Sequence, residues 1–200
     1  MANIADFKSQ LIGGGARANQ FRVYLNFPSY VTGGAFEGAR AQFLCKTASL
    51  PGSQIANVEV PYRGRIVNIA GERTFAPWNV TIYNDVTFGL RNAFETWQSG
   101  IQRYAATEGK TNPSDYQVDL EVHQLDRNGA TLKVYKFADA MPTNISAIQL
   151  DFDTANQIET FDVEFTYNYF TSNTGTDTDG ASFGVNLSVD TPIGTLPFSL

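Results

Sequence analysis

Residues 160–169 constrain the fold most strongly, because apolar and polar side chains alternate there over ten consecutive positions. The odd positions carry phenylalanine, valine and tyrosine, and the even positions carry threonine, aspartate, glutamate and asparagine. Successive side chains of a β-strand point to opposite faces of its sheet. This segment is therefore predicted to be a strand with an aromatic face in the core and an acidic, polar face outside.

Shorter runs with the same two-residue period occur along most of the chain. They lie near residues 21–27, 42–48, 55–60, 64–70, 78–83, 116–123 and 131–137. Segments with proline and glycine separate most of these runs, and Asn128-Gly129 is typical of a tight hairpin turn. The pattern indicates an antiparallel meander of strands.

One amphipathic helix is predicted over residues 86–102, because Leu90, Phe94 and Trp97 fall on one stripe at helical spacing. This stripe is expected to pack on the sheet. The polar pair Asn84-Asp85 precedes the helix and offers side-chain oxygens that can cap its first turn.

A single domain is expected over residues 1–170, followed by a C-terminal extension at 171–200. Residues 2–12 have helical spacing and precede three glycines, which predicts a short N-terminal arm. Ser29–Gly38 contains two adjacent glycines and is predicted to be a loop. The extension begins with ten polar residues that favour a flexible connection. The apolar residues within 181–200 are expected to cover the outer surface or to brace a neighbouring subunit.

Charge is distributed unevenly along the chain. All fourteen lysines and arginines lie at or before Lys136 with eleven acids, whereas the last 64 residues hold nine acids and no base. Nucleic-acid binding relies on basic side chains that displace counterions, so a conventional DNA-binding role is disfavoured. No stretch approaches the ~20 apolar residues of a membrane helix, and no membrane insertion is expected.

Few residues offer catalytic chemistry. Cys45 follows two apolar residues and is predicted to be a packed thiol, and His123 is predicted to be exposed or hydrogen-bonded. Asp151 and Asp153 are either a solvated turn or two ligands of a Ca²⁺ site, which needs ~6 to 8 oxygens, and we favour the turn. We expect no enzyme, no cofactor and no metal site.

Several short motifs occur in the order found in one protein family. They are Ala48-Ser49-Leu50-Pro51, Asn68 to Phe75, Trp78, Asn84-Asp85, Phe94 to Ser99, Pro142 to Ile145, Gln149 to Asp153 and Ile158 to Phe161. With these motifs the chain resembles the tail tube proteins of contractile-tailed bacteriophages, over about residues 17–170. That family is related to the tube proteins of type VI secretion systems.

The resemblance implies an antiparallel β-barrel or sandwich with one flanking helix, made in the host cytoplasm and assembled into the virion. Six subunits would form a ring, and rings would stack head to tail into a hollow tube inside a contractile sheath. Implied partners are the sheath, the baseplate, the tail terminator and the tape-measure protein, together with DNA that passes through without sequence-specific binding. The implied function is a conduit for genome ejection.

Two sets of residues are candidates for roles in such a tube. The candidates for contact between rings are Arg63, Arg65 and Arg73, because unlike charged ends can meet in a head-to-tail contact. A turn that binds small anions is the alternative for Arg63 and Arg65. The candidates for the channel lining are Asp119, Glu121, Asp162 and Glu164, because acidic faces would not retain DNA phosphate. Exposed outer sheet faces show the same alternation, so an exterior position is the alternative for these acids.

Two other functions fit the sequence. Aromatic-rich sheets with Asp and Asn loops also suit a carbohydrate-binding β-sandwich, which would be a monomer with exposed aromatic rings. A type VI secretion tube subunit is the other alternative, because the chemistry of the sequence alone does not distinguish it from a phage tail tube subunit.

Overall fold

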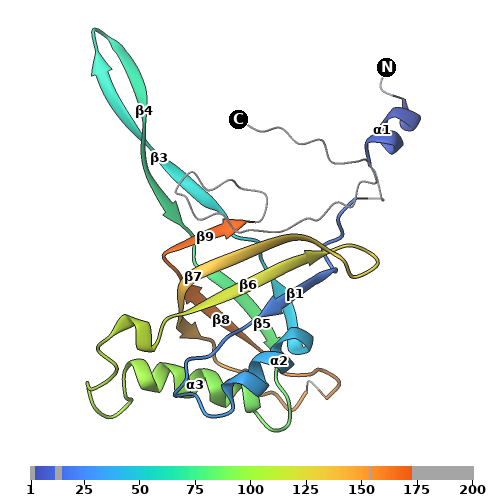
Figure 1. The fold of residues 1–200 in the computed structure, drawn as a ribbon, viewed down its shortest axis with the longest axis vertical. Coiled ribbons are helices and arrows are strands. Elements are labelled where there is room, and N and C mark those ends of the chain that lie inside the picture. The colour runs from blue at the N-terminus through green and yellow to red at the C-terminus, as the bar shows by residue number, and fades with distance from the viewer. Residues whose placement is uncertain (1–2, 12–14, 154, 173–200) are drawn as a thin grey trace, which may run out of the picture.

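The computed structural model describes residues 3–11, 15–153 and 155–172, and its elements are labelled in Figure 1. In chain order they are α1 (Ile4–Gln10), β1 (Phe21–Tyr24), α2 (Gly34–Leu44), β2 (Cys45–Ala48), β3 (Ser53–Tyr62), β4 (Arg65–Phe75), β5 (Trp78–Tyr83), α3 (Gly89–Ile101), the 3₁₀ turn η2 (Pro113–Asp115), β6 (Val118–Leu125), β7 (Thr131–Ile145), β8 (Thr160–Thr166) and β9 (Tyr169–Ser172). Among the described residues, no helix combines the length and the apolar character needed to span a bilayer.

The main sheet is antiparallel throughout, with the strand order β1-β6-β7-β8-β5-β2. β7 is long enough to serve two halves of this sheet: its first part pairs with β6 and β9, and Met141–Ile145 pairs with β8. The register shifts after Pro142, which has no N–H to donate to a neighbouring strand. Since the end strands β1 and β2 approach each other, the sheet curls into a partly open barrel, which confirms the predicted mainly β architecture.

Aromatic side chains fill the inside of this barrel. Trp78 stacks on Phe137 with 4.3 Å between ring centroids, and Phe165 packs against Trp78 at 5.5 Å. All three rings are buried, together with Phe161. Because they come from β5, β7 and β8, their burial holds the two halves of the sheet together.

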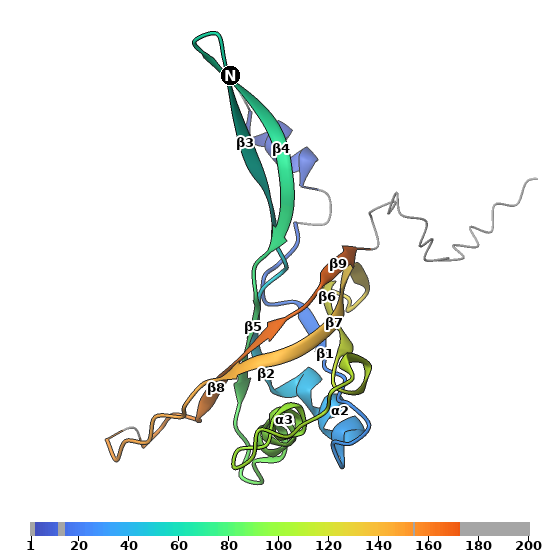
Figure 2. The same cartoon turned by 90° about the vertical axis from the view of Figure 1, so that its left-hand side faces the viewer.

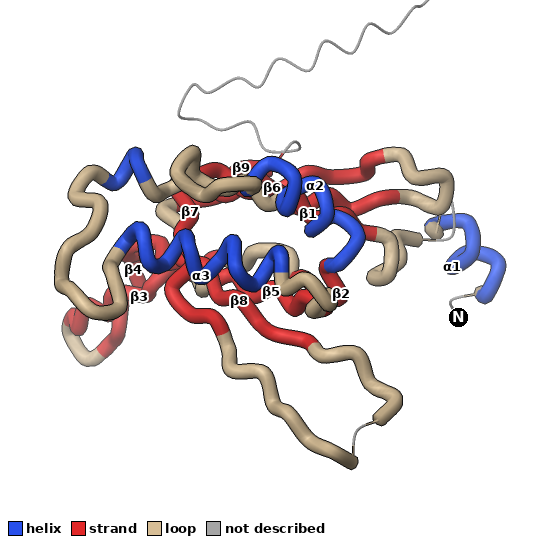
Figure 3. The backbone as a smooth tube through the Cα atoms, turned by 90° about the horizontal axis from the view of Figure 1, so that it is seen from below, coloured by secondary structure: helices blue, strands red, loops and turns tan. Residues whose placement is uncertain are grey.

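The predicted helix is confirmed as α3, with slightly shorter limits. Its buried stripe includes Leu90, Phe94 and Trp97, and the indole N–H of Trp97 donates to the carbonyl of Tyr116 at 2.7 Å. Figure 3 shows α2 and α3 lying beside each other across one end of the barrel. The helices therefore close the lower opening of the core.

The predicted loop at Ser29–Gly38 is wrong in its second half, because α2 begins at Gly34 and continues to Leu44. Glycine lowers helix propensity, so the sequence pattern favoured a loop. In the structure a Cβ on Gly34 would lie 2.6 Å from the Cβ of Phe27, and one on Gly38 would lie 2.3 Å from a backbone oxygen. These glycines are needed because the helix backbone lies directly on the preceding segment.

β3 and β4 form a separate two-stranded sheet that continues from β2 and β5 and projects beyond the barrel (Figures 1 and 2). The two predicted strands are confirmed and extend further than expected. Gly71 lies within β4 beside a shift in register. A Cβ at this position would lie 3.0 Å from the carbonyl oxygen of Ala56, so glycine permits close strand contact.

The ten-residue strand predicted at 160–169 is present, but it is interrupted. β8 ends at Thr166, the Asn168 N–H donates to the carbonyl of Ala138, and β9 then pairs with β7. The predicted domain boundary near residue 170 stays a prediction. Residues 173–200, with most of the predicted extension, lie outside the described residues.

Candidate self-assembly surfaces

The β3–β4 hairpin has one apolar face that the rest of the described chain does not cover. Val58 lies opposite Ile69, and Val60 lies opposite Val67, so all four side chains share a face. Each is 40% to 52% exposed. Tyr62 continues this face to the tip and is 60% exposed. Exposed apolar patches of this kind mark sites of protein association.

The opposite face of the hairpin is mixed in character. The side-chain amide of Asn57 donates to Asn68 at 2.9 Å, and Glu59 lies opposite Asn68. Ile66 and Pro61 also belong to this face. The hairpin is thus two-faced, and only one face is continuously apolar.

The three arginine candidates all lie on this hairpin. Arg63 is in the turn with φ 47°, and its guanidinium lies 5.3 Å from the centre of the Tyr62 ring. Arg65 begins β4 opposite Tyr62, so the structure brings Arg63 and Arg65 together at the tip. Arg73 pairs with Ile55 nearer the barrel and is separated from the other two.

The first pair of acidic candidates lies on β6. Asp119 and Glu121 alternate with buried core residues and point outward. Lys136 forms an ion pair with Asp119 at 2.8 Å, and this hydrogen bond is the main reason that the pKa of Lys136 is raised. Glu121 lies 3.0 Å from His123, which confirms that the histidine is hydrogen-bonded.

The second pair lies on β8, which is not a neighbour of β6. Asp162 accepts a hydrogen bond from Thr81 at 2.6 Å and, like Glu164, points away from the core. Glu164 lies opposite Asn79 and Asn144 on the two adjacent strands. The structure therefore places all four acids on the barrel's outer surface but does not bring the two pairs together.

A second exposed apolar surface lies at the end of the barrel opposite the hairpin (Figures 1 and 2). It consists of Val86 in the β5–α3 turn and Leu150, Phe152 and Ile158 in the β7–β8 loop. Val86 is 99% exposed and Phe152 is fully exposed. The sequence analysis missed this surface, although four apolar residues within segments rich in Asp and Asn were a usable signal.

A carboxylate network fastens this end of the molecule. Asp85 accepts hydrogen bonds from Arg40 at 2.5 Å, from the Thr87 hydroxyl and from the Gly89 N–H, so it also caps α3. Burial alone would raise the pKa of Asp85, but the bonds from Thr87, Arg40 and Gly89 outweigh burial and lower the pKa to about 2. Arg40 also pairs with Glu37 at 3.1 Å within α2, and it is the bond from Arg40 to Asp85 that ties α2 to the start of α3.

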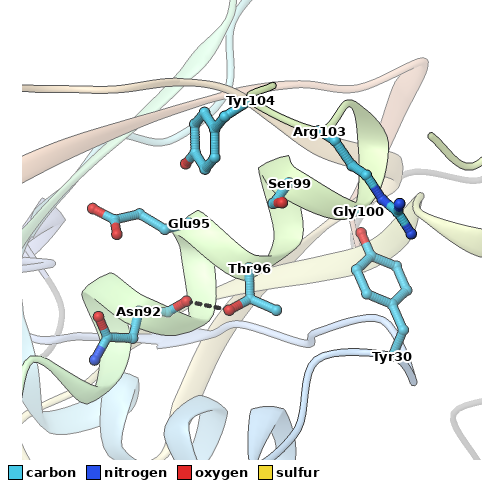
Figure 4. Close-up of a pocket in the computed structure, with 8 residues that line it drawn as sticks. All are labelled: Tyr30, Asn92, Glu95, Thr96, Ser99, Gly100, Arg103 and Tyr104. Carbon is cyan, nitrogen blue, oxygen red and sulfur yellow. Dashed lines mark hydrogen bonds between the residues drawn. The ribbon is translucent and has the colours of Figure 1, made fainter. Parts of the chain in front are cut away.

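A shallow hollow of about 540 Å³ lies along the outer side of α3 (Figure 4). Its lining residues are Tyr30, Asn92, Glu95, Thr96, Ser99, Gly100, Arg103 and Tyr104. The Tyr30 hydroxyl donates to the Trp97 carbonyl at 2.8 Å, and burial raises the pKa of Tyr30 to about 12. Glu95 accepts from Arg91 and the Thr96 hydroxyl donates to the Asn92 carbonyl, so neither is arranged for acid–base chemistry and we assign the hollow none.

The structure agrees with the packed thiol predicted for Cys45 and with the turn favoured for Asp151 and Asp153. Burial raises the pKa of Cys45 to about 12, and its thiol donates to the Thr47 carbonyl at 3.4 Å, as expected for a packed, unreactive side chain. The Asp151 carboxylate accepts the N–H of Asp153 at 3.0 Å, which is a local turn. Within the described part of the chain, no cluster of three or more His, Cys, Asp or Glu residues could hold a metal ion.

Comparison with known proteins identifies the family. A family model described as phage tail tube protein matches residues 16–173. Tail tube protein gp19 of Enterobacteria phage T4 is 35% identical over 158 residues, which cover 78% of this chain and 90% of gp19. The tail tube protein of Serratia phage KSP90 is 28% identical over 169 residues, which cover 84% of this chain and 95% of that protein.

Two solved structures show the same fold. A chain of the anti-feeding prophage cap has a TM-score of 0.58 and 19% identity, covering 80% of this chain and 92% of its own. A chain of the PVC sheath-tube complex, an extracellular contractile injection system in the extended state, has a TM-score of 0.52 and 13% identity, covering 86% of this chain and 98% of its own. The architecture, the motif order and the sequence identity agree, and the chain belongs to the phage tail tube protein family.

Proposed function

We propose that this structural protein assembles into six-membered rings that stack head to tail as the inner tube of a contractile phage tail. The tube is a conduit through which DNA leaves the virion, and the subunit performs no catalysis. Its proposed partners are other copies of itself, the tail sheath, the baseplate, the tail terminator and the tape-measure protein.

The observation that carries this proposal is the projecting β3–β4 hairpin with its uncovered apolar face. A long exposed hairpin is an aggregation hazard in a monomer unless another chain covers it. Because the face lies at one end of the molecule, a partner copy beyond that end would cover it in a heterologous contact, which repeats along an axis. Arg63 and Arg65 at the tip are the proposed charged contacts of this interface.

The structural relatives support the proposed partners. One similar chain comes from a complex described as sheath and tube, another from a tube-terminating cap, and a third from an anti-feeding prophage baseplate. These descriptions apply to the related chains, and they support the proposal because this chain shares the fold of those chains.

We also propose that acidic side chains face the channel, with Asp162 and Glu164 favoured over Asp119 and Glu121. Lys136 offsets the charge of Asp119, whereas the Asp162 carboxylate accepts a hydrogen bond from the neutral Thr81 hydroxyl. A negative channel surface would repel the DNA backbone and reduce friction on moving DNA.

Electron microscopy of the purified protein over a concentration series tests the proposal. The native chain should form six-fold rings or hollow tubes. Ile69→Asp should prevent stacking, because it places a charge on the apolar hairpin face. Asn68→Asp is the matched control, because it introduces the same residue one position away on the opposite face and should leave assembly intact.

Two results would contradict this proposal. A native protein that stays monomeric at every concentration would favour the carbohydrate-binding alternative, to be followed by glycan screening. Equal assembly of the two variants would show that the apolar face of the hairpin is not the contact. The phage origin of the 35% identical relative favours a phage tail over a type VI secretion tube.

A further inference from the structure

We infer that the β7–β8 loop and the β5–α3 turn form the receiving surface for the β3–β4 hairpin of a second copy of this chain. The receiving surface is defined here as Val86, Leu150, Phe152 and Ile158 together with Asp153. The inference rests on the proposed head-to-tail stacking and identifies the second half of that contact.

The position of the two segments is the first argument. Figures 1 and 2 show the hairpin leaving one end of the barrel, and the loop and turn lying at the other end. The Asn84 N–H donates to the Glu159 carbonyl, and the Asn84 side-chain amide donates to the Glu159 carboxylate, each at 2.9 Å. These bonds join the base of the loop to the base of the turn, so the two segments begin side by side at the same end of the molecule.

Apolar exposure is the second argument. Leu150 is 79% exposed and Ile158 is 69% exposed, and the side chains of Val86 and Phe152 are fully exposed to solvent. Burial of such side chains against another apolar surface is favourable, because it removes apolar area from water. The apolar face of the hairpin, centred on Val60 and Val67, offers the same chemistry at the far end of the molecule.

Charge complementarity identifies the occupant. Residues 146–159 contain the acids Asp151, Asp153 and Glu159 and no lysine or arginine. The hairpin tip carries Arg63 and Arg65. Since the matching surfaces lie at opposite ends of one chain, a second copy satisfies both the apolar and the charged match, and the contact repeats indefinitely.

Disulfide cross-linking tests this inference directly. The native Cys45 thiol is only partly exposed and donates to the Thr47 carbonyl, so the engineered thiols, at exposed positions, are the reactive ones. The double variant Tyr62→Cys with Phe152→Cys should give a ladder of cross-linked oligomers longer than a dimer when assembled protein is oxidised. Each single variant should remain monomeric on a non-reducing gel, and so should the pair Tyr62→Cys with Leu132→Cys, in which Leu132 is another exposed apolar residue.

A charge exchange provides an independent measurement. Arg65→Glu and Asp153→Lys should each raise the critical concentration for stacking by about five- to ten-fold, and the combined variant should recover most of the loss. Failure of the combined variant to recover would argue against a direct pairing of these two ends.

The outcomes separate this inference from the proposed function. Tubes that form without the Tyr62–Phe152 cross-link, or with an equal Tyr62–Leu132 cross-link, overturn the receiving surface and leave the tube function in place. Protein that gives neither tubes nor cross-links overturns both. A ladder confined to the Tyr62–Phe152 pair supports both.

Discussion

Asp85 joins segments that are distant in sequence. Its carboxylate contacts Arg40 of α2, the hydroxyl of Thr87 and the first N–H of α3. A charged acceptor with several donors is stronger than a neutral one, and its loss leaves donors unpaired. One side chain therefore fixes the start of α3 relative to α2.

Replacement of Asp85 by Asn should lower the free energy of unfolding at pH 7 by about 1–3 kcal/mol, because hydrogen bonds to a charged group are lost. The folded pKa of Asp85 is lowered from 3.8 to about 2. The stabilisation is therefore complete above about pH 4 and is lost as the pH falls toward 2. Urea denaturation of dilute, unassembled protein should show the gap between native chain and variant narrowing over this range.

Asp115→Asn is the control for this measurement. Asp115 is exposed on the 3₁₀ turn η2, so its replacement should leave the unfolding free energy almost unchanged. A constant gap between the native chain and Asp85→Asn from pH 7 to pH 2 would show that the charge of Asp85 is not the source of the stabilisation.

Gly38→Ala should destabilise the fold by about 1–3 kcal/mol, because a new Cβ would overlap the carbonyl oxygen of Leu25. Alanine has the higher helix propensity, by about 1 kcal/mol, so helix formation alone predicts the opposite sign. Thermal unfolding decides between the two. Gly52→Ala is the control, because its Cβ would meet no atom within 4 Å.

The same glycines explain which local structure the sequence did not predict. Composition favoured a loop before residue 38, whereas α2 exists because tight contact with Leu25 and Phe27 outweighs the poor propensity of Gly34 and Gly38. Such contact depends on segments brought together by the complete fold. The periodicity of a single segment gives no information about such contacts.

At the scale of elements, α3 contributes the largest anchor of the helical layer. Trp97 is completely buried, packs against Phe27 and Phe165, and donates to the carbonyl of Tyr116. Its stripe was predictable because one helix face is apolar over three turns.

Trp97→Ala should lower the unfolding free energy by about 3–5 kcal/mol, because a large cavity opens between α3 and the sheet. Trp97→Phe should cost less, since it keeps much of the packing but leaves the Tyr116 carbonyl without its indole donor. Denaturant unfolding of both variants measures the two contributions. Equal losses would mean that the hydrogen bond, not the packing, dominates.

The positions of the strands along the chain were more predictable than the surfaces that cover them. Alternation correctly indicated β3, β4, β5 and β8, because the two-residue period is a local property of an extended chain. It did not reveal that β3 and β4 leave the barrel, since apolar residues such as Val58 and Ile69 look the same whether a core or another subunit covers them. The receiving loop was missed for the same reason.

At the scale of the whole molecule, the position of the channel remains a proposal that labelling can test. Glu164→Cys in assembled tubes should react with a small maleimide but not with a maleimide attached to a protein too large to enter the tube. The disassembled variant is the control and should react with both reagents. Reaction of intact tubes with the large reagent would place β8 outside, and Glu121→Cys would then be tested in the same way.

The candidate residues were partly predictable from the sequence. Arg63 and Arg65 were selected by charge, and the structure places them at the tip of the projecting hairpin. That the acids of β6 and β8 line a channel stays a prediction, and their separation on non-neighbouring strands depends on the strand order. Strand order is set by long-range pairing and is not encoded in any single segment.

The continuity of β4 with β5 has a mechanical consequence. A load applied to the hairpin tip passes through Ala76 and Pro77 into β5, which has β8 on one side and β2 on the other. Antiparallel hydrogen bonds lie perpendicular to the strands, so a pull along β5 strains all of them together instead of one at a time. The subunit should therefore withstand tension along the hairpin axis far better than a sideways force, which would peel or bend the two-stranded arm at its root.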